Sequence, residues 1–369
     1  MPTTTPDRRS APDTDTAPPP ARWHQLTVAA LDRLTADTTA ITLAVPAQLA
    51  EAFRAPAGRH LVVRHRRDGR ELRRSYSLCP PPFAPEVLRL IVKRAAPDGF
   101  GVYAATELAV GDRLEVSAPT GGFRLAAIPG GHHVLLAGGT GIAPLLAMAA
   151  AALREDPHCR VSLVYSVQGM GALLLADELT DLKDAHLGRF TVLPVFSREP
   201  RAAELLSGRI DAARLHRLLA AVGTEFDATT AFYLCGPWGL VATARDALTK
   251  AGAGEVRLEL FSPEGTPAAV TPPPAGRSVR VTARLAGHTS STPMQPGDRV
   301  LLDAVLRARP DAPYSCQAGL CGSCRAKVVA GSVALGGQFA LGPAELAAGY
   351  TLTCRARPQT DAVELDFDA

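Results

Sequence analysis

Short apolar runs, separated by turn-forming residues, fill the chain from Trp23 to about Phe123. In order they read AITLAV, HLVVRH, RSYSL, VLRLIVKR and RLEVSAP. Runs of this length, interrupted so often by Gly, Pro and Asp, are typical of antiparallel strands that close into a barrel. The pattern therefore predicts an antiparallel β-barrel over residues 22–127.

After Gly130 the pattern changes, and strand-like runs alternate with longer stretches of helical character. The strand-like runs are HVLLAG, RVSLVYS, RFTVLPVF, AFYLCG and VRLELF, and the helical stretches are Ala143–Leu153, Leu174–Lys183, Asp211–Val222 and Leu240–Lys250. This alternation indicates βαβ units. We expect a doubly wound parallel sheet over residues 128–262.

Two proline-rich segments lie outside these patterns. Residues 1–21 are rich in Thr, Pro and Asp and lack the apolar region of a signal peptide, which predicts a disordered tail. Residues 263–277 predict an extended, semi-rigid linker. Residues 278–369 then carry strand-like runs at both ends and a cysteine-bearing loop between them. The chain thus divides into three domains, and its fold class is multidomain α/β and β.

Composition narrows the classes of function. A chain of 369 residues can form three domains with a core each. Its formal net charge of +3 is too small to indicate nucleic acid or a membrane surface as a partner, and its longest apolar stretches are too short to span a bilayer. Clustered cysteines in a chain without an export signal more often bind metal or do redox work than form disulfides, which predicts a cytoplasmic location.

The cysteine cluster carries the most specific signal in the sequence. Cys316, Cys321 and Cys324 have the spacing C-x₄-C-x₂-C, and Cys354 follows at a distance. This is the plant-type [2Fe–2S] pattern, in which four thiolates hold two tetrahedral irons and loop glycines let backbone N–H groups approach the sulfides. A structural zinc site and a group of buried thiols are the alternatives, but zinc ligands are usually spaced differently. The spacing favours the iron–sulfur cluster.

The segment Arg74-Ser75-Tyr76-Ser77 lies on a predicted barrel strand and has the side chains that a flavin needs. Tyr76 offers an aromatic face, Ser77 a hydroxyl near N5 of the flavin, and Arg74 a cation for the pyrophosphate. Because side chains alternate along a strand, Arg74 and Tyr76 share one face and Ser77 lies on the other. By itself the segment is equally compatible with a solvated edge strand.

Two further motifs follow strands of the predicted parallel sheet. The run Gly138–Pro144 is a glycine-rich turn that opens a helix, where backbone N–H groups favour a pyrophosphate. Cys235-Gly236-Pro237 ends another strand, at the edge where open α/β sheets bind ligands, although a free Cys is usually a small buried hydrophobe. Ser197 and Arg198 could bind the 2′-phosphate of NADPH, although a surface Arg is the commoner explanation.

With RSYS, GGTGIAP, CGP and the four cysteines in this order, the chain resembles the ferredoxin–NADP reductase superfamily. Within it, the arrangement is similar to the class with a C-terminal plant-type ferredoxin domain, which includes the reductase components of phenylacetyl-CoA epoxidase and of 3-ketosteroid 9α-hydroxylase. The resemblance covers Trp23 to Ala369. Segments such as RWHQLTV, VPAQLAEAF and FSREP favour the epoxidase reductase.

The resemblance implies a fold and a set of cofactors. It implies that the last domain is a β-grasp ferredoxin domain and that the flavin is FAD. It also implies that the nicotinamide cofactor is NADPH, with NADH as the alternative. A hydride passes from NAD(P)H to FAD, and single electrons pass through the cluster to an external oxygenase. Residues 278–369 carry nine Lys and Arg against eight Asp and Glu, whereas free plant-type ferredoxins are strongly acidic, so the balance fits a covalent partnership.

The resemblance also assigns residues. Those with a catalytic role are Tyr76, Ser77 and Cys235. The metal ligands are Cys316, Cys321, Cys324 and Cys354. The cofactor-binding residues are Arg74, Ser75, Tyr76, Ser77, Val92, Lys93, Phe100, Gly101, Gly139, Thr140, Gly141, Pro144, Ser197, Arg198, Cys235, Gly236 and Pro237.

Three departures from the family pattern remain. Gly101 replaces the Ser of the flavin-pyrophosphate loop, Val167-Gln168 replaces an Asn-Arg pair near the adenosine ribose, and Gly139-Thr140 replaces a Gly-Ser pair. The loss of the Arg at Gln168 reduces the NADPH preference that we expect to a moderate one. The competing hypotheses are a reductase for a Rieske oxygenase or a cytochrome P450, and a redox sensor without turnover.

Overall fold

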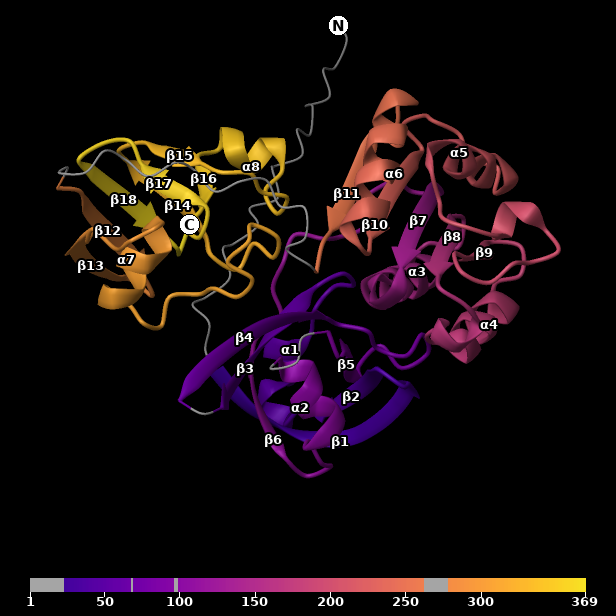
Figure 1. Cartoon of the computed structure of the whole chain (residues 1–369), viewed down its shortest axis with the longest axis horizontal. Coiled ribbons are helices and arrows are strands. Elements are labelled where there is room, and N and C mark those ends of the chain that lie inside the picture. The colour runs from indigo at the N-terminus through magenta and orange to yellow at the C-terminus, as the bar shows by residue number, and fades with distance from the viewer. Residues whose placement is uncertain (1–22, 68, 96–98, 262–277) are drawn as a thin grey trace, which may run out of the picture.

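Six antiparallel strands form the barrel that the sequence predicts (Figure 1). The computed structural model describes residues 23–67, 69–95, 99–261 and 278–369, so the predicted tail and linker lie outside the described residues. The strands are β1 (Trp23–Thr35), β2 (Thr38–Ala44), β3 (His60–Arg67), β4 (Arg70–Ser77), β5 (Leu88–Lys93) and β6 (Arg113–Ser117). They pair in the order β4-β3-β6-β1-β2-β5, and a bridge between Leu78 and Leu90 joins the two ends.

Alternate side chains of these strands fill the barrel. Leu26, Ile41, Leu61 and Leu90 are fully buried there, and each contributes about 1.5–3 kcal/mol through its removal from water. Phe100 adds an aromatic ring to this core from the helix α2 (Phe100–Thr106). The short elements η1 (Ala47–Leu49) and α1 (Ala50–Phe53) lie between β2 and β3.

A five-stranded parallel sheet forms the second domain. Its strands are β7 (His132–Gly138), β8 (Arg160–Val167), β9 (Phe190–Phe196), β10 (Thr230–Cys235) and β11 (Glu255–Glu259), in the order β11-β10-β7-β8-β9. Its helices are α3 (Ile142–Glu155), α4 (Ala176–Ala185), α5 (Ala212–Ala221) and α6 (Trp238–Lys250), with the short turns η2 (Gly139–Gly141), η3 (Met170–Ala172) and η4 (Glu204–Leu206).

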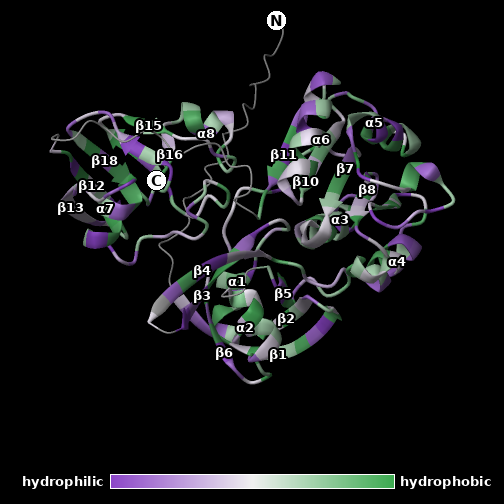
Figure 2. Ribbon diagram, viewed as in Figure 1, coloured by the Kyte–Doolittle hydropathy of each residue, from purple (hydrophilic) through white to green (hydrophobic). Residues whose placement is uncertain are grey.

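The central strand β7 is largely hydrophobic in Figure 2, and every one of its residues is buried. Leu135 and Ala137 pack in a cluster with α3 and α4, whereas Val134 and Leu136 pack in a cluster with α5 and α6. The sheet is therefore doubly wound, as predicted. The chain leaves β7 for β8 on one side and returns to β10 on the other, so the carboxyl ends of β7 and β10 meet at the topological switch point.

The third domain is a mixed sheet with a helix packed on it, the β-grasp arrangement. Its strands are β12 (Arg280–Leu285), β13 (His288–Pro293), β14 (Arg325–Ala330), β16 (Tyr350–Leu352) and β18 (Ala362–Asp366), in the order β13-β12-β18-β14-β16. Only β12 and β18 are parallel within it. A separate pair, β15 (Val333–Leu335) and β17 (Ala356–Pro358), and the helices α7 (Leu301–Ala308) and α8 (Pro343–Ala347) complete the domain.

An ion pair ties the barrel to the parallel sheet. Arg89 on β5 donates from both terminal nitrogens to the Glu178 carboxylate on α4, at 2.7 Å each, and its Nε donates to the Cys79 carbonyl. Arg89 is only 8% exposed, so the pair is screened by water less than a surface pair.

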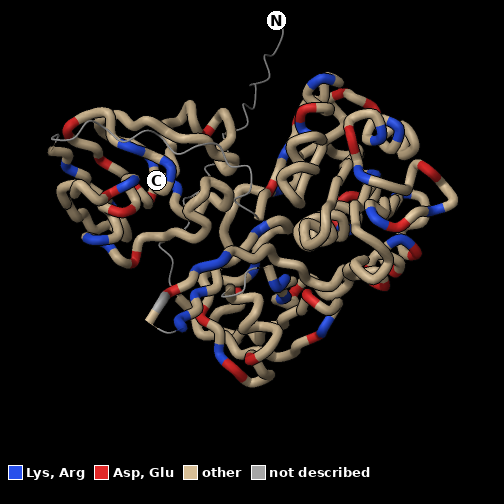
Figure 3. Tube along the Cα trace, viewed as in Figure 1, with Lys and Arg blue, Asp and Glu red and all other residues tan. Residues whose placement is uncertain are grey.

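Elsewhere charges of both signs are spread over all three domains (Figure 3). In the described part of the chain, no helix has the length and hydropathy required to cross a membrane.

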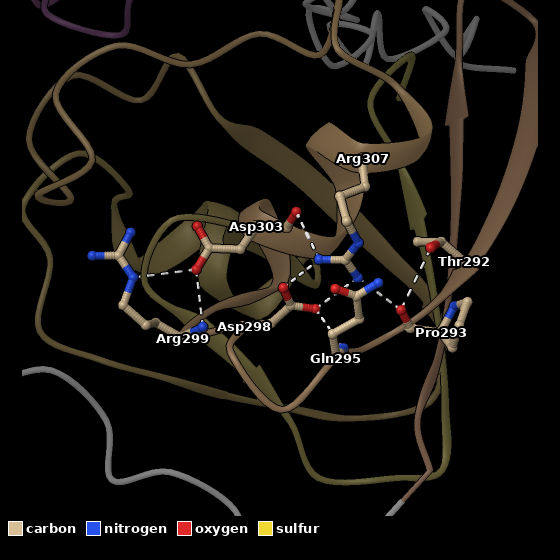
Figure 4. Close-up of polar contacts among 7 residues, drawn as sticks. All are labelled: Thr292, Pro293, Gln295, Asp298, Arg299, Asp303 and Arg307. Carbon is tan, nitrogen blue, oxygen red and sulfur yellow. Dashed lines mark hydrogen bonds and ion pairs between the residues drawn. The ribbon is translucent and has the colours of Figure 1, made fainter.

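Arg307 holds α7 to the end of β13 (Figure 4). Its Nη2 donates to Asp298 Oδ2 at 2.7 Å and to the Pro293 carbonyl at 2.8 Å, and its Nη1 also contacts Asp298. The Asp298 side chain is 6% exposed and accepts a further bond from the Gln295 N–H. Removing Arg307 would leave a buried carboxylate with most of its partners lost.

We therefore expect Arg307→Ala to lower the free energy of unfolding of the third domain by about 1.5–3 kcal/mol, the range for hydrogen bonds to charged groups. Native-state hydrogen exchange of the β12 and β18 amides in the full chain measures this change. The control is Arg299→Ala, because Arg299 is 74% exposed and its ion pair with Asp303 should contribute less than about 1 kcal/mol. Equal losses in the two variants would contradict this account of Arg307.

Candidate active site

The loop after α7 brings the four predicted cysteine ligands together. Gln317, Gly319 and Gly322 all have positive φ, which folds the loop tightly around its sulfur atoms. The Leu320 N–H, next to Cys321, donates to Cys316 Sγ, and Cys324 and Cys354 belong to one buried cluster. The four predicted ligands therefore lie at one site.

Four thiols at one site fit a binuclear iron–sulfur centre. A [2Fe–2S] cluster takes two thiolates on each iron, so the donor set has the required number and type of ligands.

Backbone donors already point at one of the sulfur atoms. The N–H groups of Ala318 and Leu320 donate to Cys316 Sγ at 3.4 and 3.3 Å. The interaction with Cys321 lowers the pKa of Cys316 to about 6 and raises that of Cys321, and the two N–H groups lower the pKa of Cys316 further. These N–H groups therefore stabilise negative charge on the Cys316 sulfur, as a thiolate ligand requires.

The predicted flavin residues lie on β4 beside an aromatic cluster. The ring of Tyr76 lies 5.7 Å from that of Phe100, and Phe100 in turn contacts His65 and Tyr103. Burial raises the pKa of Tyr76, so its phenol stays neutral. Arg74 on the same strand face is exposed and donates only to the Arg73 carbonyl among the described groups. An aromatic face with an exposed cation nearby fits an isoalloxazine and its pyrophosphate.

The other predicted flavin residues contribute backbone more than side chains. The Val92 side chain is buried in the barrel core, and the Lys93 ammonium pairs with Asp37 at 3.3 Å. A Cβ on Gly101 would lie 2.3 Å from the Lys93 carbonyl oxygen. The start of α2 thus approaches β5 too closely for any side chain at Gly101.

The two nicotinamide motifs meet at the switch point of the parallel sheet. A Cβ on Gly141 would lie 2.1 Å from the Cys235 carbonyl oxygen, and one on Gly236 would lie 2.9 Å from Gly138 Cα. The Tyr165 hydroxyl supports the loop by donating to the Gly139 carbonyl. Thr140 is half-buried at this edge, and Pro144 is buried in the first turns of α3. The motifs thus form one backbone-lined edge, where backbone N–H groups can approach a pyrophosphate.

Ser197 and Arg198 extend the parallel pairing beyond β9. Their N–H groups donate to the carbonyls of Val167 and Gln168, which places both residues at the same edge of the sheet. Arg198 is exposed. The neighbouring Glu199 carboxylate accepts a bond from the Met170 N–H at 2.7 Å and pairs with Arg201. Arg198 is therefore placed where it can reach a ligand.

Two polar residues that the sequence did not indicate lie where the domains meet. The Ser77 hydroxyl donates to Glu259 Oε2 at 2.8 Å, and His60 Nδ1 lies 3.5 Å from Glu259 Oε1. Glu259 is 8% exposed and pairs in register with Cys235. Burial lowers the pKa of His60, but the hydrogen bond and charge of Glu259 outweigh it and the pKa is raised. Burial also raises the pKa of Cys235, so this thiol stays protonated.

The sequence did not indicate these two residues because neither belongs to a local motif. Glu259 lies inside the run VRLELF, at the end of β11, and His60 begins HLVVRH, so each looks like an ordinary polar residue at the end of a strand. Their partners lie 182 and 199 positions away along the chain, since Glu259 contacts Ser77 and His60. No local spacing encodes such a contact.

A flavin site on a barrel, a nicotinamide site on a doubly wound sheet and a [2Fe–2S] loop define a flavin–iron–sulfur oxidoreductase. Family models agree with each part. The oxidoreductase FAD-binding domain matches residues 25–125, the oxidoreductase NAD-binding domain residues 135–246, and the 2Fe-2S iron-sulfur cluster binding domain residues 283–359.

The chain belongs to the ferredoxin–NADP reductase-like family of reductase components with a C-terminal [2Fe–2S] domain. It is 36% identical to one component of the 1,2-phenylacetyl-CoA epoxidase of Escherichia coli K12, over 94% of this chain and 98% of that protein. It is 33% identical to the 3-ketosteroid-9-alpha-monooxygenase ferredoxin reductase component of Rhodococcus rhodochrous, over 93% and 96%. Full-length CYP116B46 from Tepidiphilus thermophilus shares the fold with a TM-score of 0.65 and 29% identity, over 94% of this chain but only 42% of that one.

The close approach of the two nicotinamide motifs yields a prediction. Gly141→Ala should force the Cys235 backbone aside, because no Cβ fits 2.1 Å from a carbonyl oxygen. We expect NADP⁺ to bind at least about tenfold more weakly, a loss of about 1.4 kcal/mol, with FAD content unchanged. Titration calorimetry with NADP⁺ measures the affinity.

Gly188→Ala is the matched control, because nothing lies within 4 Å of the Cβ that it would add to the same domain. Binding of NADP⁺ to Gly141→Ala at the wild-type affinity would show that the cofactor does not use this edge.

Proposed function

We propose that this NAD(P)H-dependent oxidoreductase passes electrons to the oxygenase component of a phenylacetyl-CoA epoxidase-type di-iron oxygenase. The observation that carries the proposal is the meeting of the three domains around the flavin strand. Ser77 reaches Glu259 from that strand, Cys235 lies beside Glu259 in the nicotinamide motif, and Ser75 of the same strand is hydrogen-bonded to Ser315, the residue before the cluster ligand Cys316. The identity to the epoxidase component over nearly the whole chain supports the choice of acceptor.

Each site residue then has a role that its surroundings support. Arg74 holds the FAD pyrophosphate, with Val92, Lys93, Phe100 and Gly101 around the cofactor, and Ser75 contributes its backbone, because its side chain is hydrogen-bonded to Ser315. Tyr76 covers the flavin ring, and Ser77 is oriented at N5 by Glu259. The loop Gly139–Gly141 with Pro144, and the motif Cys235-Gly236-Pro237, bind NAD(P)H. The thiolates of Cys316, Cys321, Cys324 and Cys354 hold the cluster.

When bound, FAD accepts a hydride from NAD(P)H and the cluster takes up electrons one at a time. The protein itself positions the cofactors and keeps water away from them. Cys235 and Glu259 are buried, so the edge between the flavin and nicotinamide motifs excludes water. Ser77 can move a proton at its hydroxyl only toward Glu259, because that carboxylate is its hydrogen-bond acceptor. No acid–base triad is needed.

The location that we propose is the cytoplasm. Four of the seven cysteines lie in the cluster loop or face it. A reducing compartment keeps such thiols available for iron.

The cluster assignment has a direct test. Cys321→Ser removes one of four ligands, so the purified variant should lose both irons and both acid-labile sulfides but stay yellow with FAD. We expect NADPH-dependent reduction of cytochrome c to fall by at least tenfold, while ferricyanide, which can take electrons from the flavin, is still reduced. Cys159→Ser is the control, because Cys159 is buried far from the loop in the core of the parallel sheet. Stoichiometric zinc in the wild type would contradict the assignment.

The acceptor is tested by reconstitution. Wild type should support NADPH-dependent epoxidation with the purified oxygenase component of a phenylacetyl-CoA epoxidase, and Cys321→Ser should not. A ketosteroid monooxygenase component is the second candidate, because its reductase is 33% identical to this chain. Turnover with that component alone would replace the first candidate by the second. If the protein reduces cytochrome c but supports turnover by neither oxygenase component, it is a reductase for another acceptor.

We also propose NADPH as the preferred cofactor, with Arg198 on its 2′-phosphate. A charge-assisted contact contributes roughly 1.5–3 kcal/mol, which corresponds to a tenfold to hundredfold preference. Arg198→Ala should raise KM for NADPH and leave NADH nearly unaffected. Arg217→Ala on α5 is a matched control, because its exposed side chain pairs with Glu204. Unchanged selectivity in Arg198→Ala, or a wild type that prefers NADH, would exclude this role.

A further inference from the structure

Strand β4 uses its two faces for different purposes. Arg74 and Tyr76 lie on the face assigned to the flavin. Because side chains alternate, Arg73 and Ser75 point the other way. Both of these residues contact the third domain, at residues immediately before the first cluster ligand, Cys316.

Arg73 makes the larger part of this contact. Its Nη1 donates to the Ala312 carbonyl at 3.3 Å, and its guanidinium lies 4.0 Å from the centroid of the Tyr314 ring. Its Nε donates to Glu71 Oε1 at 2.8 Å, and Trp23 offers a second ring at 5.1 Å. Arg73 is 6% exposed although it is charged. Burial of a guanidinium is costly unless it is paired and stacked, so these contacts indicate a specific docking position.

Ser75 adds a directional contact two residues further along the strand. Its hydroxyl donates to the Ser315 hydroxyl at 2.9 Å, and Ser315 is 4% exposed. Ser315 directly precedes Cys316. The strand that carries the flavin residues is thus hydrogen-bonded to the residue next to a cluster ligand.

A second contact holds the cluster loop on the nicotinamide side. Trp238, the residue after Cys235-Gly236-Pro237, packs against Phe339 with ring centroids 4.9 Å apart, and Leu320 belongs to the same apolar cluster. Two points on separate domains fix both the position and the orientation of the loop. Loss of one point leaves the loop attached but free to pivot about the other.

We propose that Arg73, assisted by Ser75, is a positioning residue that docks the segment 312–315 on the back of the flavin strand and so fixes the cluster for electron transfer from FAD. The proposal rests on the assigned flavin and cluster sites and not on the identity of the terminal oxygenase. Per NAD(P)H, reduced FAD gives up two electrons in two single transfers. Each transfer reduces the cluster by one electron, and the external acceptor reoxidises the cluster between the two transfers. The hydrogen that arrived with the hydride leaves to solvent as one proton.

The test compares an acceptor that is reduced by the flavin, ferricyanide, with one that is reduced through the cluster, cytochrome c. In the full-length protein with FAD and cluster bound, Arg73→Ala should leave ferricyanide reduction by NADPH unchanged. Cytochrome c reduction, which passes through the cluster, should fall about tenfold, the factor that corresponds to loss of a contact of about 1.4 kcal/mol. Arg73→Lys keeps the pairing with Glu71 but lacks a planar group for Tyr314, so we expect an intermediate rate.

A structural readout accompanies the rates. The amides of residues 314–316 should exchange hydrogen faster in Arg73→Ala, because the docked segment opens more often. Arg66→Ala is the matched control, because Arg66 also donates to Glu71 but is 63% exposed and makes no contact with the third domain in the described structure. It should change neither the acceptor ratio nor the exchange.

Several outcomes would overturn the proposal. They are an unchanged acceptor ratio in Arg73→Ala, a parallel fall with both acceptors, and unaltered exchange at 314–316. If Arg73→Ala loses FAD or iron, Tyr314→Ala and Ser315→Ala remove the partners of Arg73 and Ser75 in the third domain, and the proposal fails if both keep the wild-type ratio. Failure with the epoxidase oxygenase alongside a changed acceptor ratio would refute only the proposed acceptor.

Discussion

A single buried carboxylate, Glu259, organises the meeting of the barrel and the parallel sheet. A carboxylate that is 8% exposed is stable only if it is hydrogen-bonded or paired, and its partners come from the barrel. The need to satisfy Glu259 therefore fixes how the end of β11 faces the start of β3 and the end of β4. Because Cys235 lies beside Glu259 in register, the same constraint brings the nicotinamide edge to the flavin strand.

Glycines provide the second constraint, by letting backbones approach where side chains could not. Gly141 lies against the Cys235 carbonyl, and Gly101 lies against that of Lys93. In both places a strand end and a helix start come close enough to leave only backbone at the surface. The cofactor edges are thus formed by peptide groups, whose geometry depends on the fold more than on the choice of side chains.

The architecture could be predicted from the sequence because its signals are local. The period of the apolar runs distinguished barrel from parallel sheet, and the cysteine spacing indicated the cluster. Local signals also limited the precision of the predicted helix bounds. Leu174 and Leu175 were predicted to be helical, but both are buried ahead of α4, and Leu175 has a positive φ of 57°. The cofactor roles of individual residues, such as Arg198, stay predictions. Glu259, His60 and Arg73 could not be found, because each depends on a partner far away along the chain.

One face of β4 is assigned to the flavin and the other contacts the third domain, and this limits how the domains can be combined with those of other reductases. A single-residue insertion or deletion in that strand would exchange its faces, so that Arg74 and Tyr76 would turn to the third domain while Arg73 and Ser75 turned to the flavin. The strand therefore tolerates substitution more readily than a change of length. A chimaera that takes its barrel from one reductase and its ferredoxin domain from another inherits only half of each contact, so barrel and ferredoxin domain are best exchanged as one unit.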